Sequence, residues 1–193
     1  MLDKEFWDNR YKSEQTGWDI GYPSTPLKEF IDDLENNDLH ILIPGCGNAH
    51  EARFLHSQGF NDVHIIDIVK EPLVNFTNAH PNFPKNKVIH GDFFEHTANY
   101  DVIIEQTFFC ALNPKKRKDY VQQMKNLLSE NGRLVGVMFG IHLPKMPPYG
   151  GDKAEYESLF SPFFYIKTME ECYNSIAPRE GTELFFIAIK KHP

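Results

Sequence analysis

The fold is decided by residues 39–51, which read LHILIPGCGNAHE. The apolar run over 39–43 has the length of a buried strand. Gly45 and Gly47 follow it, and glycine suits a place where the backbone turns sharply and a ligand approaches closely. Because residues 51–58 then have a helical pattern, we predict a strand, a tight glycine loop and a helix. An ordinary strand–helix turn that binds nothing is the alternative.

Short apolar segments and amphipathic segments alternate along the rest of the chain. Strands that read as continuous apolar runs are buried on both faces, so this alternation predicts a parallel sheet with helices on both sides. The last two strand-like segments have no evident helix between them, and we expect them to pair antiparallel at one sheet edge. The predicted strands are 39–43, 63–66, 87–89, 100–104, 133–139, 163–169 and 183–190; the predicted helices are 3–11, one that opens at Thr25-Pro26, 51–58, 72–79, and a long one from Asn113-Pro114 to Asn131-Gly132.

Composition and charge exclude several classes of protein. The chain has 193 residues, with 27 acidic against 20 basic side chains, and a formal net charge of −7. This length predicts one domain, and the acidic balance argues against a nucleic-acid partner, whose binding needs clustered Lys and Arg. The basic cluster at 115–118 is expected to be a solvated helix face. No apolar run reaches membrane-spanning length, so no membrane partner is expected.

Cysteine and histidine usage bears on the compartment and on metal binding. The three cysteines, Cys46, Cys110 and Cys172, form no CxxC pair, and residues 1–5 carry no signal-peptide pattern. Together these features predict reduced thiols in a cytoplasmic protein. We expect a monomer or a weak homo-oligomer, although no sequence feature indicates the oligomeric state. The nine histidines form no HExxH or comparable ligand pair, so the sequence predicts no metal site.

Acidic residues stand at the predicted carboxyl ends of successive strands, where open α/β sheets bind their ligands. Asp67 ends the second strand and could accept hydrogen bonds from the ribose hydroxyls of an adenosine ligand. Asp92 and Phe93 end the third, where a carboxylate and an aromatic edge suit an adenine ring. His50 replaces the third glycine of a GxGxxG motif, which disfavours a dinucleotide. Each carboxylate alone is also typical of a helix cap or a solvated loop.

Six motifs follow one another in a specific order. They are FWDNRY at 6–11, TGWDIG at 16–21, IPGCGN at 43–48, DFF at 92–94, YDVIIEQTFFCALNP at 100–114 followed by Arg117, and PPY at 147–149. In this order they resemble the thiopurine S-methyltransferase family, and above all its branch of halide/thiol methyltransferases. The resemblance implies a class I S-adenosylmethionine-dependent methyltransferase. Its α/β fold is Rossmann-like, with a mostly parallel seven-stranded sheet, an antiparallel C-terminal hairpin and helices on both faces.

The resemblance also implies the reaction and its cofactor. S-adenosylmethionine would be converted to S-adenosylhomocysteine as its methyl group moves in line to a small nucleophile, a thiol, sulfide or halide, in an apolar pocket. Residues 1–36 would form a helical lid over the cofactor, since aromatic faces suit a sulfonium cation. The lid tryptophans could instead only anchor this segment on the core. The expected cofactor contacts are Trp7, Tyr11, Trp18, Gly45, Cys46, Gly47, Asp67, Ile68, Asp92, Phe93 and Gln106.

The resemblance places Glu105 and Gln106 at the end of the fourth strand, beside the reacting centre. They are expected to position the reactants without an obligatory base. Gln106 departs from the arginine of thiopurine enzymes and from the aromatic residue of plant halide/thiol enzymes, which argues against thiopurine specificity. Pro144-Lys145-Met146 departs from a glycine pair, so the substrate loop is expected to differ in shape. The expected acceptor pocket consists of Phe108, Phe109, Phe139, Pro148 and Tyr149.

Three different functions are also compatible with these residues. An N- or O-methyltransferase acting on another small molecule could use Glu105 as a proton acceptor. Residues 104–107 read IEQT and lack the Asp/Asn-Pro-Pro-Tyr pattern of enzymes that methylate nucleic-acid bases. The second is a non-catalytic S-adenosylmethionine-binding protein, and the third is a nicotinamide oxidoreductase.

Overall fold

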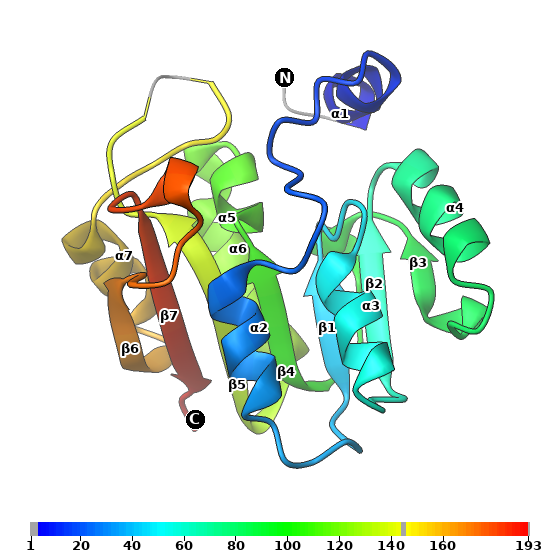
Figure 1. Cartoon of the computed structure of the whole chain (residues 1–193). Helices are drawn as coiled ribbons and strands as arrows, with labels where there is room; N and C mark the ends of the chain where they lie inside the picture. The colour runs from blue at the N-terminus through cyan, green and yellow to red at the C-terminus, as the bar shows by residue number, and fades with distance from the viewer. Residues whose placement is uncertain (1–3, 144–145, 193) are drawn as a thin grey trace.

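The computed structural model of the chain describes residues 4–143 and 146–192. A 7-stranded sheet has the order β3-β2-β1-β4-β5-β7-β6 (Figure 1). Neighbouring strands are parallel from β3 through β5, and β7 runs antiparallel to both β5 and β6. The predicted parallel sheet with an antiparallel edge pair is therefore confirmed. The strands are β1 (Ile41–Pro44), β2 (Val63–Asp67), β3 (Val88–His90), β4 (Tyr100–Gln106), β5 (Leu128–Phe139), β6 (Phe164–Glu171) and β7 (Glu183–Lys190).

Helices cover both faces of the sheet (Figure 1). A cluster of buried apolar side chains lies on each side of the sheet. Ile41 and Ile43 of β1 belong to the cluster with α2, α3 and α4, whereas Leu42 belongs to the cluster with α5, α6 and α7. Successive strand residues point to opposite faces, so one continuous apolar run serves both cores. The helices are α1 (Lys4–Lys12), α2 (Thr25–Asp32), α3 (His50–Ser57), α4 (Lys70–Ala79), α5 (Phe108–Ala111), α6 (Arg117–Leu127) and α7 (Lys153–Phe160).

The long helix predicted from Asn113-Pro114 to Asn131-Gly132 is shorter in the structure. Asn113 caps a 3-10 turn, η3 (Pro114–Lys116), and α6 follows it and ends at Leu127. Leu128 is buried and already pairs with Tyr100 in the sheet, so tertiary packing ends the helix before the Asn-Gly signal. Asn131 instead adopts a left-handed φ of 62° within β5, a conformation that asparagine tolerates.

Two helices were not predicted. α5 is a single turn of 4 residues, too short to show a period. α7 has a clear start signal, because Asp152 accepts a hydrogen bond from the Glu155 amide at 2.8 Å. An aspartate followed three positions later by a glutamate is typical of a helix N-terminus, and this signal could have located α7.

The crossover from β3 to β4 differs from its neighbours. α3 and α4 follow β1 and β2, but residues 91–99, all of them described, contain only the 3-10 turn η2 (Phe93–Glu95). On this face α6 packs against β5 and η2. His64, which lies on this face near the amino end of β2, consequently remains half-buried.

None of the described helices is long and apolar enough to span a membrane. The longest of them, α6, has 11 residues.

Candidate functional site

A cavity of about 680 Å³ lies between the carboxyl ends of β1, β2 and β4 and the N-terminal segment. Small-molecule pockets measure about 300–1,000 Å³, and open α/β sheets bind ligands at this place. The lining residues are Lys4, Trp7, Arg10, Tyr11, Gln15, Gly17, Trp18, Gly45, Ile66, Asp67, Ile68, Val69, Gly91, Asp92, Phe93, Phe94, Gln106, Thr107, Phe108, Ala111, Leu112, Asn113, Lys116, Phe139, Pro147, Pro148 and Arg179.

The cavity brings together most of the residues that the sequence singled out. Each of the first three strand ends contributes to it, as does the predicted lid. Pro144 and Lys145, where the substrate loop was expected to change shape, lie outside the described residues. The expected site residues that do not line the cavity are Cys46, Gly47, Glu105, Phe109 and Tyr149.

The glycine loop needs both of its glycines. Gly45 has a left-handed φ of +56°, and a Cβ there would lie 2.1 Å from the Phe108 ring. Gly47 has a φ of +50°, and its Cβ would lie 2.9 Å from the Tyr11 hydroxyl. Both positions combine a conformation that L side chains avoid with a close neighbour, so the loop is shaped for close approach to the cavity.

Asp67 is a buried carboxylate that holds the glycine loop against β2. Its Oδ2 accepts a hydrogen bond from the Gly47 amide at 2.9 Å, and its Oδ1 accepts one from the Val69 amide at 2.8 Å. Burial raises the pKa of Asp67, and these two hydrogen bonds oppose that rise. A carboxylate has about four acceptor sites, so Asp67 can also accept hydrogen bonds from a ligand in the cavity.

Asp92 combines the two roles that its position suggested. Its Oδ1 accepts a hydrogen bond from the Phe94 amide at 2.9 Å and so caps η2, while the residue also lines the cavity. Phe93 is buried beside it, edge-to-face with Phe108 at a centroid distance of 5.3 Å. A carboxylate and two aromatic rings therefore meet at one side of the cavity.

Glu105 and Gln106 point to opposite faces of β4. Gln106 lines the cavity, and its buried Nε2 has no hydrogen-bond partner among the described residues. Glu105 is fully buried behind the wall, where its Oε2 accepts a hydrogen bond from the Phe109 amide at 3.1 Å. Burial raises the pKa of Glu105 to about 8. The expected place of Glu105 beside the cavity is thus not what the structure shows, because adjacent strand residues alternate between faces.

Asp19 of the TGWDIG motif fastens the N-terminal segment to the glycine loop. Its Oδ1 lies 2.7 Å from His50 Nε2 and accepts a hydrogen bond from the Gly21 amide at 2.7 Å, while Asn48 Nδ2 donates to Oδ2. The hydrogen bond with His50 is the largest cause of a lowered pKa of Asp19. No role was predicted for Asp19 from the sequence, although its motif was the signal available.

Trp18 makes contacts through both its ring and its backbone carbonyl. Its ring lies edge-to-face with Trp7 and Tyr11, at centroid distances of 5.6 and 5.7 Å. Its carbonyl accepts a hydrogen bond from Arg179 Nη2 at 2.8 Å, and Arg179 also pairs with Glu183 of β7 at 3.3 Å. The N-terminal aromatic group is therefore connected to the far end of the chain, and no local sequence pattern announces that contact.

Cationic side chains, none of them predicted, contribute to the wall. Lys116 lies 5.3 Å from the centre of the Phe94 ring, and Arg179 lies 6.0 Å from that of Phe139. Within the described lining the only carboxylates are Asp67 and Asp92, so cationic groups outnumber acidic ones although the chain carries a net charge of −7. The cationic lining residues are Lys4, Arg10, Lys116 and Arg179.

The segment that carries Pro147 and Pro148 is attached to α5 and α6. The Tyr149 amide donates to the Cys110 carbonyl at 2.7 Å, and Arg117 Nη2 donates to the Gly150 carbonyl at 2.9 Å. Arg117 is buried and pairs with Glu155 at 2.5 Å. These contacts put both prolines in the cavity wall.

Known proteins are similar to this chain in sequence and in fold. A model of the family described as thiopurine S-methyltransferase matches residues 2–185. A probable thiol methyltransferase 2 of Arabidopsis thaliana is 29% identical, with 92% of this chain and 81% of that protein covered. Thiocyanate methyltransferase 1 of Brassica oleracea is 31% identical over the same shares. The structure of Burkholderia thailandensis 1,6-didemethyltoxoflavin-N1-methyltransferase has a TM-score of 0.81, covering 99% of this chain and 88% of its own, and at 16% identity it shows a shared fold.

Proposed function

The chain belongs to the thiopurine S-methyltransferase family of S-adenosylmethionine-dependent methyltransferases, and from this premise we propose that its acceptor is a small anionic nucleophile, a thiolate or a halide. One observation carries the proposal. The cavity that is lined by most of the predicted cofactor residues also has a wall of aromatic and cationic side chains, and its described lining contains no histidine and no carboxylate except the two aspartates expected to bind the cofactor.

The described residues fit the cofactor. Gly45 has no room for a Cβ and leaves its backbone open to a ligand. In this proposal Asp67 accepts hydrogen bonds from the ribose hydroxyls, and Asp92 accepts one from the adenine amino group. Trp7 and Trp18 offer aromatic faces to a cation. When bound, S-adenosylmethionine supplies a methyl group activated by a sulfonium.

The charges of the wall support an anionic acceptor. Arg10, Lys116 and Arg179 bring positive charge to the lining, and two of them also pair with acids outside it, Lys116 with Asp119 at 3.1 Å and Arg179 with Glu183 at 3.3 Å. A protonated amine or a phenol must lose a proton before it can attack, but Glu105 lies behind the wall and the described lining contains no histidine. A thiolate or a halide brings its attacking electron pair without that step.

The protein's own contribution is to position the reactants and to exclude water. The unpartnered Gln106 amide can donate a hydrogen bond to the cofactor's carboxylate or to the acceptor. Phe108, Phe139 and Pro148 narrow the cavity, so an anion inside it meets little water. Residues 4–18, which line the cavity, act as the lid in this proposal, whereas α2 packs in the core on one face of the sheet. Asp19 is one of the contacts that hold the lid in place.

A panel of acceptors with labelled S-adenosylmethionine tests the proposal. Hydrosulfide, a small alkyl thiol and iodide are compared with a primary amine and a phenol at matched concentrations. We expect turnover with the thiols or with iodide and none with the amine or the phenol. Turnover confined to the amine or the phenol would overturn the proposal. Calorimetry with S-adenosylhomocysteine is the control, since a preparation that does not bind it cannot report on acceptors.

A further inference from the structure

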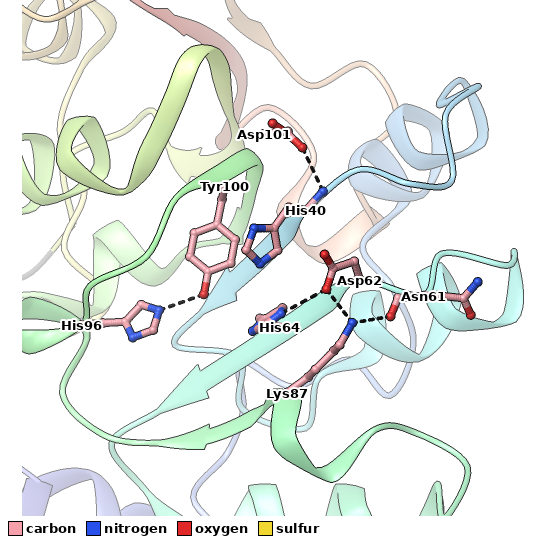
Figure 2. Close-up of polar contacts among 8 residues, drawn as sticks. All are labelled: His40, Asn61, Asp62, His64, Lys87, His96, Tyr100 and Asp101. Atoms are coloured by element: carbon pink, nitrogen blue, oxygen red, sulfur yellow. Dashed lines mark hydrogen bonds and ion pairs between the residues drawn. The ribbon is translucent and has the colours of Figure 1, made fainter.

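A second cluster of polar side chains lies at the amino ends of β1 and β2, at the opposite end of these strands from the cavity. His40 directly precedes β1, Asp62 directly precedes β2, and His64 is the second residue of β2 (Figure 2). The parallel register pairs Ile41 with Val63 and so brings these side chains together. Each offers one ligand atom, and the three atoms lie within 4.8 Å of one another.

The crossover without an α-helix keeps this cluster open to solvent. His40, Asp62 and His64 are all half-buried, so an ion could reach them from solution. The centroids of the two imidazole rings lie 4.7 Å apart. The buried Tyr100 ring packs against them, with centroid distances of 4.4 Å to His40 and 5.6 Å to His64. The Tyr100 ring therefore packs beside the imidazoles, while its hydroxyl lies 2.8 Å from His96 Nε2 (Figure 2).

Asp62 already attracts a cation in this structure. Its Oδ1 lies 2.5 Å from Lys87 Nζ and 3.2 Å from His64 Nε2. The Asp62 carboxylate therefore lies between an imidazole and an ammonium group.

We propose that His40, Asp62 and His64 bind one divalent transition-metal cation of the zinc class. Two imidazole nitrogens with one carboxylate oxygen suit Zn²⁺ and its neighbours in the first transition row, whereas Ca²⁺ and Mg²⁺ prefer oxygen ligands alone. Bond lengths of about 2.0–2.2 Å put tetrahedral ligand atoms roughly 3.3–3.6 Å apart, so small side-chain rotations close the site. Water would complete the coordination, and the ion would displace Lys87 from Asp62.

This metal site is independent of the proposed function. The cluster lies at the amino ends of β1 and β2, and the cavity lies at their carboxyl ends. No sequence motif joins the three ligands, because the sheet register rather than their spacing along the chain unites them.

Calorimetric titration of the metal-free full chain with Zn²⁺ tests the site, and we expect one ion per chain. His40→Gln and His64→Gln should each weaken binding by more than the roughly 10- to 100-fold that loss of an outer-shell partner costs. His142→Gln is the matched control, because His142 is an exposed histidine that also pairs with a carboxylate, Asp152, at 3.6 Å. This control should bind like the wild type.

Lys87→Met provides a variant in which the affinity for zinc should rise instead of fall. Removing the ammonium frees Asp62, so zinc binding should tighten severalfold, and far-UV circular dichroism confirms that each variant is folded. Cobalt substitution identifies the ligands, since nitrogen and oxygen ligands give visible bands without a thiolate charge-transfer band. No binding, binding unchanged in both histidine variants, binding not tightened by Lys87→Met, or a thiolate band would each overturn the inference.

Discussion

Replacing Asp19 by alanine tests whether the lid must be fastened to the glycine loop for the cofactor to bind. The carboxylate contacts His50, Asn48 and the Gly21 amide, and its side chain is 19% exposed. Hydrogen bonds to a charged group contribute about 1.5–3 kcal/mol each, but contacts that share one carboxylate are not additive. The variant should therefore lose about 2–4 kcal/mol of anchoring, which is roughly a 30- to 700-fold change in the lid equilibrium.

Two measurements report on that loss. Apparent affinity falls with the fraction of molecules that are competent to bind, so calorimetry should show S-adenosylhomocysteine binding weaker by about tenfold or more. Limited proteolysis should cut the variant faster within residues 13–24. Asp32→Ala is the control, because it removes only an exposed pair with Lys28, worth at most about 0.5 kcal/mol. An Asp19→Ala protein that keeps wild-type affinity within about twofold and wild-type protease resistance would refute the reasoning.

Three further substitutions have defined outcomes. Gly45→Ala adds left-handed backbone strain of about 1–2 kcal/mol and puts a Cβ 2.1 Å from the Phe108 ring. Urea unfolding should therefore show a free energy of unfolding lower by about 2–4 kcal/mol, and an unchanged midpoint would contradict this. Asp67→Asn removes a charged acceptor from the cavity and should weaken S-adenosylhomocysteine binding by about tenfold or more, and equal affinity would argue against its cofactor role. Glu105 has a folded-state pKa of about 8 against an unfolded value of 4.5, so its contribution to stability is present below pH 4.5 and lost as pH rises through about 8. Glu105→Gln should reduce the dependence of the free energy of unfolding on pH between 4.5 and about 8. A variant that keeps the wild-type pH dependence would contradict the raised pKa of Glu105.

The succession of strands along the chain could be predicted from the sequence because most of them contain a short apolar run. β1 serves both cores at once, and that requirement leaves a strong local signal in residues 41–43. The ends of helices were less predictable. The long predicted helix ends early because Leu128 is drawn into the sheet beside Tyr100, and a contact between distant residues has no local signature.

The candidate site also contains residues that could be predicted from the sequence and residues that could not. Residues at strand ends, such as Asp67 and Asp92, could be located from motif and topology together. Glu105 could have been separated from Gln106 by strand alternation, which forbids neighbours from facing the same side. Arg179 could not be found, because its contact with Trp18 joins two ends of the chain. The cationic side chains of the cavity wall could not be predicted for a related reason, because they come from separate segments of the chain.

The attachment of residues 147–149 to α5 and α6 has a consequence for how this enzyme can change. The residues proposed to bind the cofactor belong to the strand ends and the N-terminal segment, whereas Pro148 is fixed through Cys110 and Arg117. Under the proposed function, substitutions at Phe139 or Pro148 alter which acceptor fits without touching the glycine loop. Divergence or laboratory evolution can then vary the acceptor range while cofactor recognition is conserved.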